Sequence, residues 1–430
     1  MIVTLLLGCP DAPTPEVDYS LLRPDSADAT AALATSGSRF GAGLRAVDFD
    51  GNGVDELLVG TGPTTDVEGA ESSTWVLDGA SLTPLARFEG AATALSAGMT
   101  DAGPVFVSAV SWEPALESAT LRRVDDPLGP SPTTTLLGMD RVNDVTLADL
   151  DGDGASDLVV ASLEQGLYVY SGLPETFPES PPMAQLTAFD SHFLSAAAMD
   201  VDGDGVDELL GGAWMEDDPE ADRQEEGAVY VFEAPFSGDV AASDARAVVY
   251  GTRHVANGFI YEGETGRRVS DGGDLDGDGL PETLIAAKTW FWGASLAARG
   301  TQRLTEMALL RLDGEDGHHD EPGESAATLD VDGDGVLDLL VGAPGAQVSG
   351  YPVGAVYLLY GPVSGQWDLG AAAEVKLAAA TPDDELGATL AVVRGPDGLG
   401  VVVGAPGTQA GSDTEAGALW LWGAAVLAGG

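Results

Sequence analysis

An acidic, glycine-bearing loop followed at once by an apolar run recurs five times along this chain of 430 residues. Its fullest copy reads DVDGDGVLDLLVGAP and begins at Asp330; the others begin at Asp48, Asp149, Asp200 and Asp274. Recurrence of one short unit over the whole length indicates a repeat architecture, in which each unit buries its apolar strand against its neighbours. The sequence therefore predicts one closed array rather than several unrelated domains.

The spacing of the acids within each loop predicts a cation site. Carboxylates at loop positions 1, 3 and 5 converge only if the chain wraps around a point, and glycine at position 6 permits the positive φ that this requires. Two carboxylates about 4 Å apart repel by about 4 kcal/mol at an effective dielectric of about 20, so gathered acids need a counter-ion. Calcium accepts roughly six to eight oxygens in irregular geometry. We predict about five Ca²⁺ sites with structural roles, completed by the carbonyl of position 7 and an acid at position 9. The predicted ligands are Asp48, Asp50, Asn52, Val54 and Glu56; Asp149, Asp151, Asp153, Ala155 and Asp157; Asp200, Asp202, Asp204, Val206 and Glu208; Asp274, Asp276, Asp278, Leu280 and Glu282; and Asp330, Asp332, Asp334, Val336 and Asp338.

Two alternatives to such sites were weighed. An EF-hand shares the first half of the loop, but it needs a glutamate at position 12 and flanking helices. Position 12 is here Val59, Val160, Gly211, Ile285 or Val341, which excludes an EF-hand. The other alternative is a set of acidic turns that bind no metal, which would not require acids at positions 1, 3 and 9 of every copy.

The apolar run after position 9 is short and rich in leucine and β-branched residues, which favours a buried strand. Seven units with this strand pattern can be traced, and the second and seventh lack the acidic loop. The predicted fold is all-β, a seven-bladed β-propeller with four-stranded antiparallel blades spanning 37–430. The approximate blades are 37–90, 91–138, 139–185, 186–255, 256–322, 323–378 and 379–430.

The motifs also carry a family resemblance. An FG or LG pair shortly before DxDGDGxxD, then LLVGAP, then GAVYV resembles the FG-GAP repeats of the α-integrin N-terminal propeller and of related bacterial FG-GAP or VCBS-type proteins. The resemblance implies a seven-bladed propeller with calcium between the first two strands of a blade, a ligand surface on the opposite face, and an adhesive or recognition role. The metal loops fall in blades 1, 3, 4, 5 and 6, unlike the consecutive C-terminal blades of an α-integrin, so an integrin-style heterodimer is not expected.

The first 36 residues predict an anchor and a tether. Residues 1–9 resemble a signal segment with a lipobox, in which Cys9 would be lipidated; a short signal remnant with an incidental cysteine is the alternative. Residues 10–36 are rich in Pro, Ala, Asp and Ser and read as a tether. Either residues 19–22 or residues 424–427 could supply the strand that closes the ring.

The net charge of −52, from 70 acidic and 18 basic residues, argues against nucleic acid or an anionic membrane surface as a partner. No run of about 20 apolar residues exists, so the chain is expected to meet a membrane only through a lipid at Cys9. We expect an exported, cell-surface, outer-membrane-anchored or extracellular protein with a monomeric body.

Four tryptophans follow the apolar runs of blades 2, 4 and 5 and could line the metal-free face: Trp112, Trp214, Trp290 and Trp292. They could anchor a protein or glycan ligand, or they could merely fill the ends of their own blades. We expect the acidic segment 216–226 and the segment 289–304, with Arg299 and Arg303, on the same face.

No motif of a hydrolase, metalloprotease or phosphate-binding loop is present, so no catalytic residue is predicted. The pair His318 and His319 before Asp320 could ligate a transition metal, but adjacent side chains usually diverge and a polar inter-blade loop is the simpler interpretation. The predicted function is an adhesion or recognition module for protein or glycan. A structural component of a cell-envelope assembly, and an enzyme with a site in the exit loops, are the alternatives.

Overall fold

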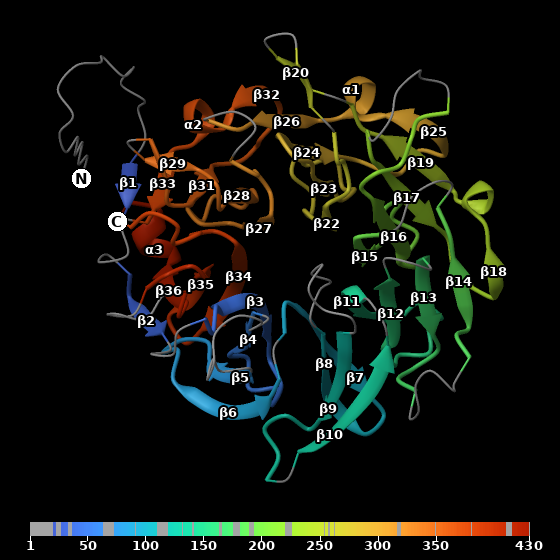
Figure 1. The fold of residues 1–430 in the computed structure, drawn as a ribbon, viewed down its shortest axis with the longest axis horizontal. Coiled ribbons are helices and arrows are strands. Elements are labelled where there is room, and N and C mark those ends of the chain that lie inside the picture. The colour runs from blue at the N-terminus through green and yellow to red at the C-terminus, as the bar shows by residue number, and fades with distance from the viewer. Residues whose placement is uncertain are drawn as a thin grey trace.

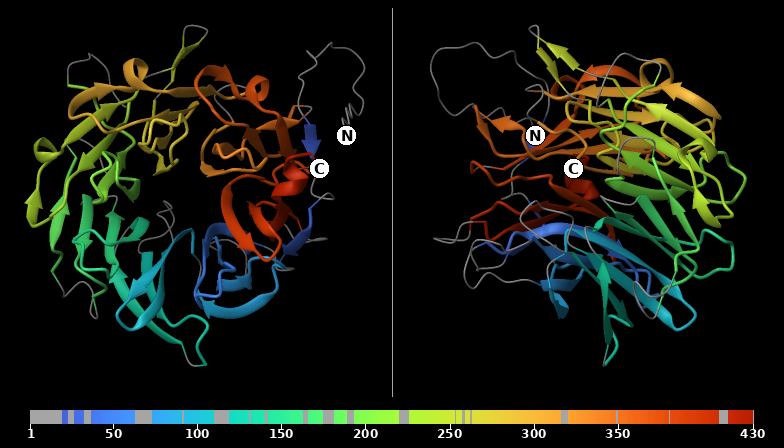
Figure 2. Two further views of the ribbon diagram at one scale, coloured as in Figure 1. Left: turned by 180° about the vertical axis from the view of Figure 1, so that it is seen from behind. Right: turned by 45° about the vertical axis from the view of Figure 1, so that its right-hand side comes forward.

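The computed structural model describes residues 20–22, 27–32, 37–62, 73–90, 92–109, 119–130, 132–139, 142–162, 166–174, 181–188, 193–219, 226–252, 254–256, 259–261, 263–315, 320–348, 350–379, 381–409 and 415–429. Seven sheets built on four antiparallel strands stand as blades around a central axis (Figure 1, Figure 2). The first strands of neighbouring blades contact one another and form the inner ring. The predicted all-β, seven-bladed propeller is confirmed.

In chain order, the first three blades share the simple up-and-down topology. Blade 1 is β3 (Phe40–Val47), β4 (Glu56–Thr61), β5 (Ser73–Asp78) and β6 (Pro84–Glu89). Blade 2 is β7 (Ala94–Thr100), β8 (Gly103–Ala109), β9 (Ala119–Asp125) and β10 (Thr133–Met139). Blade 3 is β11 (Val142–Ala148), β12 (Asp157–Ser162), β13 (Gly166–Tyr170) and β14 (Ala184–Leu186).

The remaining four blades repeat this order. Blade 4 is β15 (Ser195–Met199), β16 (Glu208–Ala213), β17 (Ala228–Phe232) and β19 (Ala247–Tyr250). Blade 5 is β22 (Arg268–Asp271), β23 (Thr283–Ala286), β24 (Trp290–Ala294) and β26 (Leu310–Asp313). Blade 6 is β27 (Ser325–Leu329), β28 (Asp338–Ala343), β31 (Ala355–Leu359) and β33 (Val375–Ala378). Blade 7 is β34 (Thr389–Gly395), β35 (Gly398–Ala405), β36 (Ala418–Gly423) and β2 (Ala29–Ala32). Two further hairpins, β20 (His254–Ala256) with β21 (Phe259–Tyr261) and β29 (Gln347–Val348) with β30 (Tyr351–Pro352), lie outside the blade sheets.

The apolar runs bury both faces of each second strand. Successive strand residues point to opposite faces, and Leu339 packs in the core between blades 5 and 6 while Leu340 packs in the core between blades 6 and 7. Every residue of β4, β12, β16 and β28 is buried. The hydrophobic cores accordingly lie between neighbouring blades, which holds the ring together.

The glycine of the LLVG run lets the backbones of adjacent blades approach closely. A Cβ added at Gly342 would lie 2.2 Å from the carbonyl oxygen of Gly387, and one at Gly212 would lie 2.1 Å from that of Gly266. Beside these contacts, the hydroxyls of Ser325 and Ser195 donate hydrogen bonds of 2.7 and 3.0 Å to the same two carbonyls. The motif glycine is therefore required by packing between blades.

Short parallel strands, which we call straps, cover the outer edges of blades 3 to 6. Each strap is a fifth strand that comes from the next blade in the ring: β18 (Gly238–Val240) on β14, β25 (Gly300–Arg303) on β19, β32 (Gly365–Asp368) on β26, and β1 (Ser20–Leu22) on β33. One helical turn follows each of the first three straps: η2 (Ala242–Asp244), α1 (Leu304–Met307) and α2 (Leu369–Ala372). Straps remove unpaired strand edges, which are sites of unwanted pairing.

The N-terminal segment closes the ring, at a place that differs from both sequence predictions. Residues 29–32 form the outer strand of blade 7, where β2 pairs antiparallel with β36 (Figure 1). Residues 20–22 supply only the strap on blade 6, and Ala424–Leu427 form the helix α3. The prediction that 10–36 is a tether is therefore wrong for residues 20–22 and 29–32. The alternating exposure of Ala29–Ala32 explains the error, because an edge strand of alanine and threonine carries no strong apolar signal.

Candidate metal centres

Each acidic loop folds around the carboxylate at its position 1. In blade 6, Asp330 Oδ1 accepts hydrogen bonds from the amides of Gly333 and Asp334 at 2.7 and 3.1 Å, and its Oδ2 accepts one from Gly335 at 2.9 Å. The same three bonds recur in the other four loops at 2.7 to 3.1 Å. Gly335 has φ +87°, a conformation that disfavours any side chain. The position-1 acid and the glycines thus set the loop conformation.

The position-9 acid begins the second strand, or in blade 5 directly precedes it, and is buried beneath the loop. Asp338 is 1% exposed, and its Oδ2 accepts a hydrogen bond of 2.7 Å from the amide of Val331. The equivalent bond recurs in every loop, at 2.8 to 3.0 Å in the other four. One oxygen of this acid therefore ties the strand to the loop, which leaves the other oxygen for a second partner.

Burial raises the pKa of all five position-9 carboxyls. The largest shift is at Glu282, whose pKa rises to about 7. Burial is the main cause; the hydrogen bond from Leu275 opposes it, and the charges of Asp276, Asp278 and Asp274 add to it. Desolvation and nearby carboxylates both disfavour the charged form of such a buried acid.

Positions 1, 3 and 9 of each loop come together as a group of three carboxylates. In each group the three residues offer oxygens that lie within 4.8 Å of one another. We name the groups after their blades: cluster 1 (Asp48, Asp50, Glu56), cluster 3 (Asp149, Asp151, Asp157), cluster 4 (Asp200, Asp202, Glu208), cluster 5 (Asp274, Asp276, Glu282) and cluster 6 (Asp330, Asp332, Asp338). An all-oxygen donor set without imidazole or thiolate suits a hard cation such as calcium or magnesium. These clusters could hold metal ions.

The position-5 side chains lie outside the clusters. In each loop their Oδ1 accepts a hydrogen bond from the position-7 amide, at 2.7 to 2.9 Å, as Asp334 does from Val336. The predicted position-5 ligands Asn52, Asp153, Asp204, Asp278 and Asp334 are not members of these groups of three and remain predictions. The position-7 carbonyl ligands remain predictions.

The surroundings of the clusters differ from blade to blade. In clusters 3 and 6 the second oxygen of the position-9 acid accepts an amide hydrogen bond, from Gly172 at 2.7 Å and from Gly361 at 2.8 Å. Cluster 1 opens into a cavity of about 510 Å³ that is also lined by Leu85, Phe88 and Leu128. Cluster 4 contacts a buried arginine, Arg246, that the sequence reading did not single out.

Two of the tryptophans predicted to face a ligand are instead core residues. Trp290 and Trp292 lie within β24, 4% and 2% exposed, with their ring centroids 5.7 Å apart. The guanidinium of Arg311 covers both rings, 4.3 and 5.4 Å from the centroids. The reason is the short connection 287–289, which places both rings in the third strand instead of an exit loop. Trp214 is half-buried in the turn after β16.

The segment that carries Arg299 and Arg303 also lies elsewhere than predicted. It connects the third and fourth strands of blade 5, and its strap β25 runs along blade 4. Arg303 donates to Asp218 at 2.6 Å, and Arg299 pairs with Glu233. Trp112, Cys9, His192, His318 and His319 lie outside the described residues, as do residues 220–225 of the acidic segment.

The face opposite the clusters carries the two described hairpins that lie outside the blade sheets. Strands one and two of a blade are joined on the cluster face, so strands two and three, and successive blades, are joined on the other face. Both extra hairpins arise there: β29–β30 joins the second and third strands of blade 6, and β20–β21 joins blade 4 to blade 5. Among the described residues of these connections, Met215 and Tyr351 carry large apolar side chains that are 39% and 61% exposed.

Comparison with known proteins identifies the repeat. The model of the FG-GAP-like repeat matches residues 128–211, and the model of the FG-GAP repeat matches residues 194–232 and 322–359. Integrin alpha-PS2 of Drosophila melanogaster is 32% identical over 95 residues, which cover 22% of this chain and 6% of that protein. This chain is therefore an FG-GAP repeat protein that resembles the integrin alpha propeller.

A solved structure supports the fold. The crystal structure of BBS1N in complex with ARL6DN, soaked with lead, has a TM-score of 0.50 at 9% sequence identity, covering 90% of this chain and 93% of that chain. Such a likeness concerns the fold alone. An FG-GAP propeller supports a ligand-binding or recognition module, and the five acidic clusters are compatible with calcium. None of the helices in the described ranges is long and apolar enough to cross a bilayer.

Proposed function

We propose that this chain is an exported recognition module that binds calcium at its acidic clusters and a protein or glycan ligand on the opposite face. The observation that carries the proposal is the structural difference between the two faces of the propeller. The cluster face repeats one loop geometry five times, whereas the opposite face bears both extra hairpins. Irregular loops on a rigid scaffold are where binding residues concentrate.

Calcium fits the cluster chemistry. When bound, the ion would neutralise each group of three carboxylates and hold the loop against the second strand. The residues that would hold it are those of positions 1, 3 and 9, of which position 9 is buried. The integrin relative gives the proposal its adhesive and extracellular character, and a lipid on Cys9 would keep the exported protein at a membrane surface.

Tyr351 and Met215 are the residues that we assign to ligand contact. Aromatic and methionine side chains are enriched in protein interfaces, and the side chains of Tyr351 and Met215 are exposed on the face opposite the clusters. The ligand face is proposed to combine the β29–β30 hairpin with the turn after β16. The partner is a protein or a glycan, and neither nucleic acid nor a bare anionic membrane suits the charge of −52.

The test is binding of the purified chain to an array of glycans and matrix proteins, in millimolar calcium and in chelator. The variants Tyr351→Ala and Met215→Ala should lose binding at least tenfold with an unchanged melting temperature. Matched controls are Trp367→Ala and Met99→Ala, which remove side chains that are 54% and 51% exposed in the strap β32 and in strand β7 at the cluster face. Equal loss in the controls, or no binding by the folded wild type, would contradict the proposal and favour an assembly component.

A further inference from the structure

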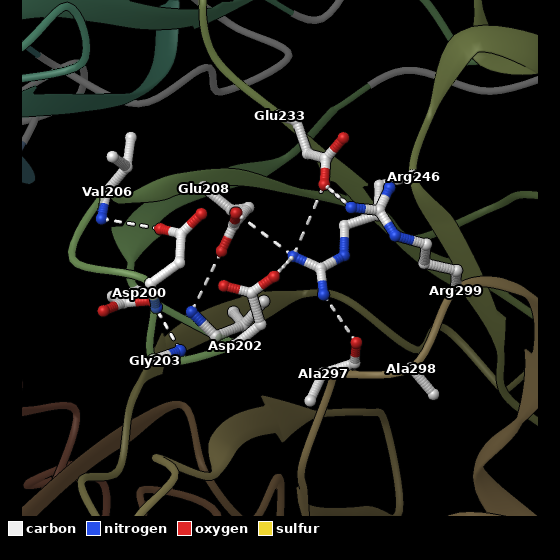
Figure 3. A network of polar contacts seen from close by, with 12 residues as sticks. Asp200, Asp202, Gly203, Val206, Glu208, Glu233, Arg246, Ala297, Ala298 and Arg299 are labelled. Carbon is white, nitrogen blue, oxygen red and sulfur yellow. Dashed lines mark hydrogen bonds and ion pairs between the residues drawn. The ribbon is translucent and has the colours of Figure 1, made fainter.

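Cluster 4 differs from the other clusters because a protein cation already lies in it. Arg246 Nη1 is 2.8 Å from Asp202 Oδ2 and 3.1 Å from Glu208 Oε1, and both residues belong to the cluster (Figure 3). Figure 3 shows the guanidinium pointing into the space between these carboxylates. Among the ion pairs between described residues, none joins an arginine or a lysine to a carboxylate of clusters 1, 3, 5 or 6.

The guanidinium is enclosed on its remaining sides. The Arg246 side chain is 2% exposed, its Nη2 donates a hydrogen bond of 2.5 Å to the carbonyl of Ala297, and Glu233 lies 3.7 Å from Nη1. Glu233 is in turn paired with Arg299. Ala297 and Arg299 precede the strap β25, so blade 5 covers the arginine of blade 4. A buried guanidinium requires such carboxylate partners, since an unpaired buried charge is strongly destabilising.

The loop itself has adjusted to the arginine. In the loops of clusters 1, 3, 5 and 6, the position-3 carboxylate accepts a hydrogen bond of 3.0 to 3.2 Å from the position-5 amide. In the described loop of cluster 4, the amide of Asp204 donates to Asp200 alone. Asp202 is also the one position-3 acid that is partly buried instead of exposed. Its carboxylate has therefore turned from its own loop toward Arg246.

We propose that the guanidinium of Arg246 is the resident cation of cluster 4, in place of the calcium ion that the other four clusters bind. An ion held by the same oxygens at about 2.3 to 2.6 Å would lie within about 5 Å of Nη1, so the two positive charges compete for one site. The consequence is that the junction of blade 4 with the strap of blade 5 is independent of calcium. The count of four ions rests on the proposed calcium function, whereas the role of Arg246 does not.

The experiment compares Asp202→Asn with Asp332→Asn, which makes the same change at position 3 of cluster 6. Melting temperature is measured in chelator and in millimolar calcium, and bound calcium is counted by equilibrium dialysis of the full chain. In chelator, D202N should melt below wild type because it loses an ion pair, whereas D332N should melt at or above wild type because it relieves repulsion. In calcium, D332N should bind one ion fewer than wild type and D202N the same number, four.

Arg246→Gln and Arg246→Lys complete the test. R246Q should melt below wild type in chelator and should gain a fifth ion and part of the lost stability in calcium, whereas R246K should stay closer to wild type. If wild type bound five calcium ions and D202N four, the proposal would be overturned. Cluster 4 would then hold calcium on Asp202 Oδ1, the oxygen that has no hydrogen-bond partner. A melting temperature of R246Q in chelator equal to wild type would overturn it too. Absence of bound calcium in every variant, with D202N and R246Q still destabilised, would refute the calcium function and retain the arginine.

Discussion

Replacing Glu282 by glutamine should stabilise the metal-free protein at alkaline pH, and calcium should reduce this gain. The pKa of Glu282 is raised to about 7 from an ordinary value of 4.5, chiefly by burial. Between these two pH values the folded state holds more protons than the unfolded state, so stability falls as pH rises. The contribution of Glu282 is complete below about pH 4.5 and is lost once the pH passes about 7.

The size of this effect follows from the shift. One pKa unit corresponds to about 1.4 kcal/mol, so the full shift would be about 3.4 kcal/mol. The other acids of cluster 5 are partly or fully exposed, and solvent screening reduces the value to about 1 to 2 kcal/mol. At about 2 °C per kcal/mol, E282Q in chelator should melt about 2 to 4 °C above wild type at pH 8 and at the wild-type temperature at pH 4.5.

Calcium should reduce the difference between E282Q and wild type. A site with a dissociation constant of about 10⁻⁴ to 10⁻³ M contributes about 0.4 to 1.4 kcal/mol at about 1 mM calcium, and E282Q weakens one such site. The assay is calorimetric melting at four pH values, each with chelator and with calcium. Asp101→Asn, in the β7–β8 turn of the blade without an acidic loop, is the control for a general loss of charge. A wild-type melting temperature in chelator that is flat or rises between pH 5 and 8, or an E282Q curve that coincides with D101N, would refute the reasoning.

Two further predictions concern the ring. Gly342→Ala should lower the free energy of unfolding by about 2 to 4 kcal/mol in urea titration, because its Cβ would lie 2.2 Å from the Gly387 carbonyl. The control Gly293→Ala, whose nearest neighbour would be 3.4 Å away, should lower it by less than about 1 kcal/mol. Equal effects of the two substitutions would contradict the packing argument. Removal of residues 1–36 should lower the melting temperature more than removal of residues 1–26, because only the longer deletion takes β2 from blade 7; indifference to the longer deletion would show that β2 does not close the ring.

The acidic loops could be predicted from the sequence because their determinants are local. Asp330 accepts hydrogen bonds from amides only three to five residues away, and Gly335 supplies the positive φ within the same loop. The blade count followed from the same repeat. The buried run Leu339–Leu340 needs only neighbouring blades on both sides, which the repeat itself provides.

The errors arose where distant segments decide the structure. Trp290 and Trp292 were expected in an exit loop, but the short turn 287–289, which resembles no standard signal, places them in the third strand. Ala29–Ala32 becomes a strand only because β36 offers it an edge. Arg246 is distant from Glu208 along the chain, and no local sequence pattern predicts their ion pair. Sequence spacing therefore located the clusters but not what surrounds them.

The straps connect these observations. Where blade 5 sends β25 across blade 4, the carbonyl of Ala297 completes the enclosure of Arg246, and cluster 4 is closed by protein atoms alone. On blade 1 the described residues contain no strap, and cluster 1 opens into the cavity of about 510 Å³ instead. Equivalent carboxylate clusters are thus enclosed by protein atoms in blade 4 and open to a cavity in blade 1. The repeat thus fixes the three acids, and in blade 4 the connection between the third and fourth strands, together with the strap of blade 5, supplies the cation and its enclosure.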